Sequence, residues 1–303
     1  MNSLTDQFDK SLSRRQALRN LGLGAVGMTA LGAFAKNVSA APSTGLDAAI
    51  GQFALNLEYL EAEFYTYAFY GYGIDDPRLP GGPIPVTGSG TPGTVTIKPN
   101  PQVPFSDPKI QQYADEIGGD ERNHVKLFRG FLSAAGAQPV ARPKIDLLNS
   151  FNTLAQVAGI GQSFDPFAND VNFLLGAFIF EDVGVTLFGG AAKLLTNKDL
   201  LDSAAGVLAV EAYHAGNIRV NIFEKGDGPI GIAQKISDTR KALSGADDDQ
   251  GVVLNGKANI VPTGADGTAF RRTTRQGLNI VYGAVGASSG LFFPNGLNGP
   301  ISS

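Results

Sequence analysis

The two histidines of this 303-residue chain constrain its fold more than any other feature. Each stands three positions after a glutamate, in the pairs Glu121/His124 and Glu211/His214. On an α-helix, positions i and i+3 share a face, so each pair directs a carboxylate and an imidazole to one point. The chain holds only eight glutamates. Two such pairs that use every histidine therefore predict one metal site built from two helices.

Two further helical segments carry a glutamate among apolar residues. One surrounds Glu58, with Glu61 and Glu63 close by, and the other surrounds Glu181 in the most hydrophobic stretch of the chain. A carboxylate buried in such surroundings without a partner costs several kcal/mol. The pattern therefore predicts a cation or a hydrogen-bonding partner at Glu181.

Helical periodicity defines the main elements of the chain. Apolar residues recur at steps of three and four, which is the period of a helix with one buried face. The expected helices span residues 45–70, 107–135, 169–195 and 199–225, with a shorter one over 230–243.

Long connections rich in glycine and proline separate these helices. Residues 71–104 contain eight of the 17 prolines, and a small hairpin is expected there from 86–88 and 94–97. A second long connection covers 137–168. The segment 246–303, rich in glycine, asparagine and proline, is expected to be an irregular extension packed on the bundle.

The candidate ligands are spaced almost equally in two halves of the chain. Glu58 and Glu121 are 63 positions apart, and Glu181 and Glu211 are 30 apart; without the 34 residues of 71–104 the first interval is 29. Glu, Glu-x-x-His, Glu, Glu-x-x-His over four helices is the ligand set of ferritin-like dimetal carboxylate bundles. The predicted fold is all-α: a ferritin-like four-helix bundle with one long crossover, occupying residues 41–245.

Four carboxylates and two imidazoles form a hard, mixed oxygen and nitrogen environment that suits iron or manganese. Their four negative charges balance two divalent ions, and such a pair of ions reacts with O2 or peroxide. Tyr65 lies on the Glu58 face and is a candidate redox side chain, with a packing role as the alternative. The predicted cofactor is two Fe or Mn ions, and the predicted ligands are Glu58, Glu121, His124, Glu181, Glu211 and His214.

Four segments resemble a known family. They are LEYLEAEFY at 57–65, GDERNH at 119–124, ANIVP at 258–262 and FFPNGLNG at 292–299. Through them the chain resembles the ferritin-like family that includes bacterial and plant desiccation-related proteins, over nearly all of the chain after residue 40.

The resemblance assigns roles to individual ligands. In related bundles the first-helix ligand stands seven positions before a tyrosine, which selects Glu58, seven before Tyr65, and leaves Glu61 as an alternate ligand. The resemblance also implies that Glu121 and Glu211 bridge the two ions.

The first forty residues have the composition of an export signal. Arg14 and Arg15 precede an apolar run over 21–35, and small residues precede a cleavage site expected near Ala40-Ala41. The paired arginines resemble a twin-arginine (Tat) signal, although Ala17 stands where that pattern usually carries phenylalanine. An ordinary secretory signal is the alternative. Either signal predicts a periplasmic or secreted protein.

Composition excludes several classes of function. Without residues 1–40 the chain carries 19 basic and 26 acidic side chains, which argues against a nucleic-acid partner. The absence of cysteine excludes disulfides and thiolate metal sites. No membrane span is expected after residue 40, and the sequence is compatible with an oligomer.

These features predict an exported protein with a dimetal centre. The centre is expected to act on O2 or peroxide, as in a ferroxidase, a peroxidase or a catalase-like oxidoreductase, or to handle iron in stress or desiccation protection. The alternative is a non-enzymatic stress protein that keeps the bundle for structure or metal sequestration. A cage-forming storage ferritin is disfavoured, because the insertion at 71–104 and the C-terminal extension obstruct a compact shell.

Overall fold

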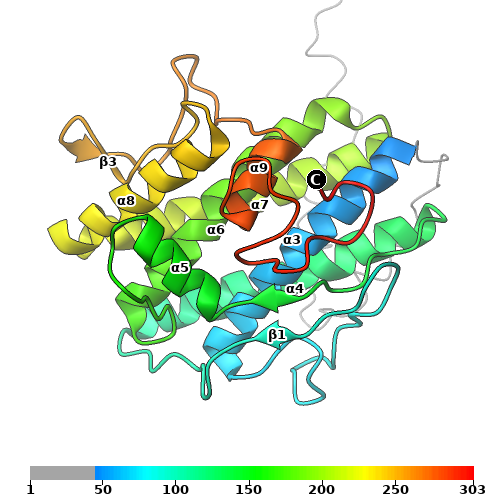
Figure 1. Cartoon of the computed structure of the whole chain (residues 1–303), viewed down its shortest axis with the longest axis horizontal. Helices are drawn as coiled ribbons and strands as arrows, with labels where there is room; N and C mark the ends of the chain where they lie inside the picture. The colour runs from blue at the N-terminus through cyan, green and yellow to red at the C-terminus, as the bar shows by residue number, and fades with distance from the viewer. Residues whose placement is uncertain (1–44) are drawn as a thin grey trace, which may run out of the picture. The chain divides into compact units, whose positions relative to one another are not determined.

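The structure is a computed structural model that describes residues 45–303, so the expected export signal and its cleavage site lie outside the described residues. Helix α3 packs along α4 and helix α6 along α7, and the two pairs meet through α3 against α6 and α4 against α7 (Figure 1). This arrangement is the predicted all-α four-helix bundle. Its helices are α3 (Gly45–Tyr70), α4 (Pro108–Ala134), α6 (Asp170–Ala191) and α7 (Lys198–Glu224).

Capping residues set where the bundle helices begin. Asp107 accepts a hydrogen bond from the backbone N–H of Lys109 at the start of α4, and Asn169 accepts one from Asn172 at the start of α6. Asn197 caps α7 in the same way. Each cap satisfies a backbone N–H that has no partner within the helix, which explains why the expected boundaries agree with the observed ones to within a few residues.

Helix α6 is apolar on all sides. Together with the 3-10 turn η2 (Ala192–Leu194), it is the single helix of residues 45–303 with the length and composition of a membrane span, at a mean hydropathy of 1.6. In the structure 83% of that apolar stretch is buried. A helix that is hydrophobic all round is typical of a protein core, and α6 contacts α3, α7, α8 (Asp227–Ser244) and α9 (Thr274–Tyr282).

The hairpin expected within the 71–104 insertion is wrong. Strand β1 (Val95–Thr96) pairs in parallel with β2 (Ile145–Asp146) from the crossover connection. The other expected hairpin strand pairs with the same connection, because Arg142 donates its backbone N–H to the carbonyl of Val86. Both segments therefore satisfy their backbone groups on the crossover chain rather than on each other.

The crossover between the two helix pairs contains a helix that periodicity did not indicate. Helix α5 (Asn149–Val157) is nine residues long. Its Phe151 is buried, with ring centroids 6.0 Å from Phe64 of α3 and 5.9 Å from Phe180 of α6. Nine residues are too few for the periodic pattern to be distinct, and the packing of Phe151 supplies stability that so short a helix lacks alone.

The C-terminal extension is more ordered than expected. It contains the antiparallel strands β3 (Val253–Leu254) and β4 (Lys257–Ala258), and α9, whose N-terminus has a capping box formed by Thr273 and Gln276. After α9 the chain lies across α3 (Figure 1). There the Asn56 side chain binds both the carbonyl and the N–H of Asn298.

A buried ionic cluster fastens this extension to the bundle. Asp182 of α6 binds Arg219 of α7 and Arg240 of α8, each at 2.9 Å. Asp249 binds both Arg240, at 2.8 Å, and Arg272, at 2.7 Å, and so links these two arginines. No member is more than 7% exposed. The ionic cluster consists of Asp182, Arg219, Arg240, Asp248, Asp249 and Arg272.

Candidate metal centre

The six predicted ligands come together inside the bundle, and all are at most 6% exposed. One comes from each of α3 and α6, and a Glu-x-x-His pair comes from each of α4 and α7. They form two groups, and within each group the ligand atoms all lie within 4.8 Å of one another. The first group is Glu58, Glu121, His124 and Glu211, and the second is Glu121, Glu181 and His214.

Glu121 stands between the two groups. His124 Nδ1 lies 3.3 Å from Oε2 of Glu121 and 3.3 Å from Oε2 of Glu58. His214 Nδ1 lies 3.1 Å from Oε1 of Glu121 and 3.3 Å from Oε2 of Glu181. One carboxylate thus serves both groups, as a bridging ligand does. Glu211, the other expected bridge, belongs to the first group, with Oε1 3.6 Å from His124 Nδ1.

The centre contains buried polar atoms with no hydrogen-bond partner within residues 45–303. Four of the five carboxylate oxygens have charge contacts with a histidine Nδ1, at 3.1–3.6 Å. No hydrogen bond offsets the cost of removing these oxygens from water, and the four carboxylates also repel one another. Divalent cations would satisfy them, so the donor set fits a pair of metal ions. The atoms are Glu58 Oε2, Glu121 Oε1, Glu181 Oε2, both carboxylate oxygens of Glu211 and His214 Nδ1.

In the metal-free centre the carboxyl groups differ in their pKa values. Burial raises the pKa of Glu58 to about 8, and burial with repulsion from Glu121 raises the pKa of Glu211 well above its usual range. Burial also raises the pKa of Glu181. At Glu121 burial acts in the same sense, but the attraction of His124 outweighs it and the pKa is lowered. Glu121 is therefore the carboxylate that stays ionised most readily.

The imidazoles respond in the opposite sense. Burial alone would lower the pKa of His124, but the charges of Glu121 and Glu58 raise it to about 11. Burial likewise opposes protonation of His214, and Glu181 and Asp120 raise its pKa to about 12. Both rings therefore carry a second proton in the metal-free protein, and a metal ion has to displace it.

Two neighbouring side chains contact the ligands. Asp120 lies 3.2 Å from His214 Nε2, the ring nitrogen that faces away from the group. A carboxylate in this place fixes the orientation of a metal-binding imidazole. The hydroxyl of Tyr65 donates a hydrogen bond to Oε1 of Glu181, so the candidate redox tyrosine lies directly against the centre.

The other two glutamates of α3 lie outside both groups. Glu63 binds Arg142 and accepts a hydrogen bond from the backbone N–H of Ile74. Glu61, the alternate ligand, is 6% exposed, and repulsion from Glu121 adds to burial in raising its pKa. Glu61 lines a cavity beside the centre. No local sequence pattern indicates this cavity, because its walls come from distant parts of the chain.

Comparisons with known proteins agree with this arrangement. The chain matches the family described as ferritin-like domain over residues 46–224. It is 33% identical to the desiccation-related protein PCC13-62 of Craterostigma plantagineum over 233 residues, 73% of this chain and 68% of that protein. It is 26% identical to the ferritin-like catalase Nec2 of Nesocodon mauritianus over 275 residues, 83% of each chain. No solved structure matches the chain significantly. With more than half of its length matched and its four helices arranged in a bundle, the chain belongs to the ferritin-like domain family.

Proposed function

We propose that this protein holds two iron or manganese ions and carries out redox chemistry on O2 or peroxide outside the cytoplasm. The observation that carries the proposal is the convergence of four carboxylates and two imidazoles, several of whose buried polar atoms lack hydrogen-bond partners. The similarity to a protein named a ferritin-like catalase supports peroxide as the reactant. The predicted export signal supports the location.

Bound iron or manganese would supply the electron transfer that reactions of O2 and peroxide require. The chain's own side chains would bind the ions, exclude water from the centre and supply protons. Glu121 holds both groups together, and the buried Phe64 and Phe173 pack on the ring of Tyr65. Burial raises the pKa of Tyr65 well above 10, so its hydroxyl keeps its proton and holds it at Glu181.

The first test is metal content together with turnover. Purified protein loaded with Fe(II) or Mn(II) is analysed for metal, then assayed for O2 release from hydrogen peroxide and for Fe(II) oxidation. We expect about two ions per chain and turnover that Glu121→Gln and His124→Ala abolish. Glu116→Gln, an exposed position on the same helix, is the matched control.

Two results contradict the proposal in different ways. Fewer than about one ion per chain, unchanged in Glu121→Gln, contradicts the metal centre itself. Two ions per chain without turnover of either reactant contradicts the enzymatic role. That second result favours metal sequestration in stress protection, a role for which the similarity to a desiccation-related protein is the supporting observation.

A further inference from the structure

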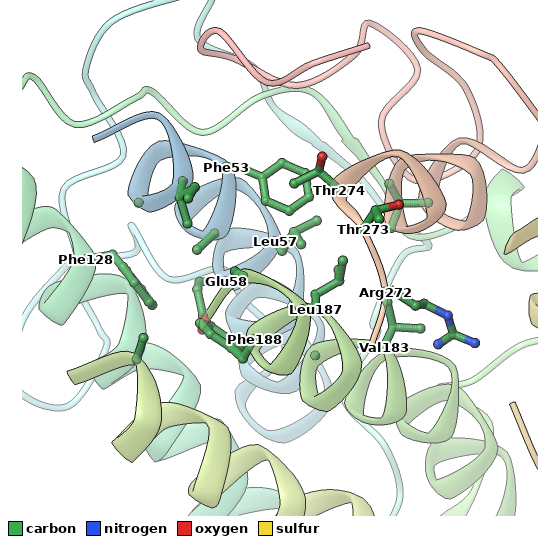
Figure 2. Close-up of a pocket in the computed structure, with 18 of the residues that line it drawn as sticks. Phe53, Leu57, Glu58, Phe128, Val183, Leu187, Phe188, Arg272, Thr273 and Thr274 are labelled. Atoms are coloured by element: carbon green, nitrogen blue, oxygen red, sulfur yellow. The ribbon is translucent and has the colours of Figure 1, made fainter. Parts of the chain in front are cut away.

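A cavity of about 400 Å³ lies beside the metal centre, between α3, α6 and α9. Its walls are almost entirely apolar, and Figure 2 shows side chains from several helices directed toward the same space. Cavities of this size, with few polar groups in their walls, are typical of binding sites for small molecules. The apolar wall includes Phe53, Leu57, Phe128, Val183, Leu187 and Phe188.

One side of the cavity borders the metal centre. Glu58, a member of the first ligand group, lines it, and so does Gly184, which lies against the carboxylate of Glu211. Glu61 lines the same cavity and is 6% exposed. No side chain or backbone group of residues 45–303 forms a hydrogen bond or an ion pair with it. A carboxyl group so placed is available to form a hydrogen bond with a molecule in the cavity.

The opposite side offers hydroxyl groups and little charge. Figure 2 shows Thr273 and Thr274 across the cavity from Glu58, with the guanidinium of Arg272 directed away from it. That guanidinium is occupied by Asp248 and Asp249. Lys193, at the cavity edge, is exposed to solvent. Arg272 is thus the buried cation of the cavity wall, and its charge is already paired with two carboxylates rather than available to an anionic ligand.

We propose that this cavity binds an uncharged, apolar small molecule with one hydroxyl-type polar end, oriented with that end at Glu61. Water fills a cavity only where it finds two to four polar partners, and an apolar cavity of about 150 Å³ stays dry and holds benzene. In proportion to benzene, a cavity of about 400 Å³ accommodates a molecule of about 16 heavy atoms. Medium-chain alcohols and bicyclic aromatic alcohols have this size and chemistry.

The proposed binding does not depend on the redox function. The cavity is formed by side chains that are not metal ligands, Glu58 excepted, and its apolar walls persist whether or not the centre holds ions. Binding is therefore expected in metal-free and metal-loaded protein alike. Loss of peroxide turnover with intact ligand binding, or the reverse, distinguishes failure of one proposal from failure of the other.

The experiment uses the uncharged fluorescent probe N-phenyl-1-naphthylamine with the full chain. The chain has no tryptophan, so no tryptophan emission overlaps with the absorption or the emission of the probe. We expect one probe molecule per chain, displaced by 1-decanol more strongly than by decane or decanoate. Stronger displacement by decanoate would overturn the assignment of an uncharged ligand.

Substitutions that fill the cavity locate the bound probe. Ala54→Phe on α3 and Val183→Phe on α6 narrow it from opposite helices, and each is expected to weaken probe binding at least tenfold. Val157→Phe, at a side chain 62% exposed on α5, is the matched control. Circular dichroism and metal content establish that each variant folds. Folded filling variants that bind the probe as the unsubstituted protein does would overturn the proposal.

Glu61 is tested through selectivity. Glu61→Leu is expected to reduce the preference for 1-decanol over decane at least fivefold, because the polar end loses its partner. Glu61→Gln keeps a hydrogen-bonding group of the same shape and is expected to retain the preference. An unchanged preference in Glu61→Leu would overturn the proposed orientation.

Discussion

A Cβ atom on Gly184 would lie 2.2 Å from Oε2 of Glu211 and 2.9 Å from its carboxyl carbon. Real Cβ atoms do not approach other atoms this closely, so the glycine of α6 gives the glutamate of α7 the space to enter the centre. A methyl group at this position would force the Glu211 carboxylate to move away from the place it occupies in the centre. The position of one ligand is thus set by the absence of a side chain on the facing helix.

Gly184→Ala is therefore expected to displace Glu211 and reduce metal content from about two ions to one or fewer per chain. Gly206→Ala, in α7 itself, has no atom within 4 Å of the added methyl group. This control should keep its metal and gain slightly in stability, because alanine favours a helix over glycine by about 1 kcal/mol. Elemental analysis checks both variants, and equal metal content in them would contradict the steric argument.

The two imidazoles differ in their supporting contacts. Asp120 precedes Glu121 and lies against His214, whereas the corresponding position before Glu211 is Val210, which has no carboxylate. Asp120→Ala should weaken the affinity of the His214 group for metal about 10–100-fold and leave the other group unchanged.

A metal titration followed by calorimetry should therefore show two tight sites in the unsubstituted protein, and one tight and one weak site in Asp120→Ala. Asp202→Ala, an exposed position on α7, is the control. Weakening of both sites equally would show that Asp120 acts on the whole centre rather than through one ring.

Metal affinity is expected to rise with pH. In the metal-free protein the raised pKa values of His124, about 11, and His214, about 12, keep both rings protonated through the neutral range. The raised pKa of Glu58, about 8, leaves that carboxyl largely protonated at pH 7 as well. Because ions bind the deprotonated groups, each proton displaced adds about tenfold in affinity per pH unit.

Titration of weakly buffered protein with Mn(II) measures the protons directly. We expect at least two protons released per chain at pH 7 and an apparent dissociation constant that decreases from pH 6 to pH 8. An affinity independent of pH over this interval would mean that the metal-free centre is already deprotonated.

Tyr65→Phe separates metal binding from reactivity. The substitution removes the hydroxyl that binds Glu181 but keeps the ring in its aromatic surroundings. Metal content should be unchanged, whereas peroxide or Fe(II) turnover should fall at least tenfold if this hydroxyl supplies protons or electrons. Tyr67→Phe, two positions along the same helix, is the control. Full activity of Tyr65→Phe would assign Tyr65 to packing.

Removal of one arginine from the ionic cluster should strongly destabilise the protein, because it leaves buried carboxylates without their full complement of positive charge. Arg272→Met removes the arginine paired with Asp248 and one of the two paired with Asp249, and is expected to reduce the free energy of unfolding by about 3–5 kcal/mol. Arg271→Met, at the exposed neighbouring position, should change it by less than about 0.5 kcal/mol. Urea unfolding followed by circular dichroism measures both, and similar values would mean that the extension does not unfold together with the bundle.

The bundle and the candidate ligands were predictable because both depend on local spacing. A helix of 26 or 27 residues, such as α3 or α4, repeats its apolar pattern over several turns and ends at capping residues. A glutamate three positions before a histidine lies on the same helix face whatever surrounds it. Helix α5, with nine residues, lacks enough turns for the same inference.

By itself, the sequence determined the four long helices, the pairing of glutamates with both histidines and the similarity of the two halves. Only the tertiary structure decided that residues 95–96 pair with 145–146, that Asp182 binds arginines of two other helices, and that Glu61 faces a cavity. These features depend on contacts between residues far apart in the chain. A helical or strand period specifies which residues share a face, but the partner of that face is set by how the helices pack.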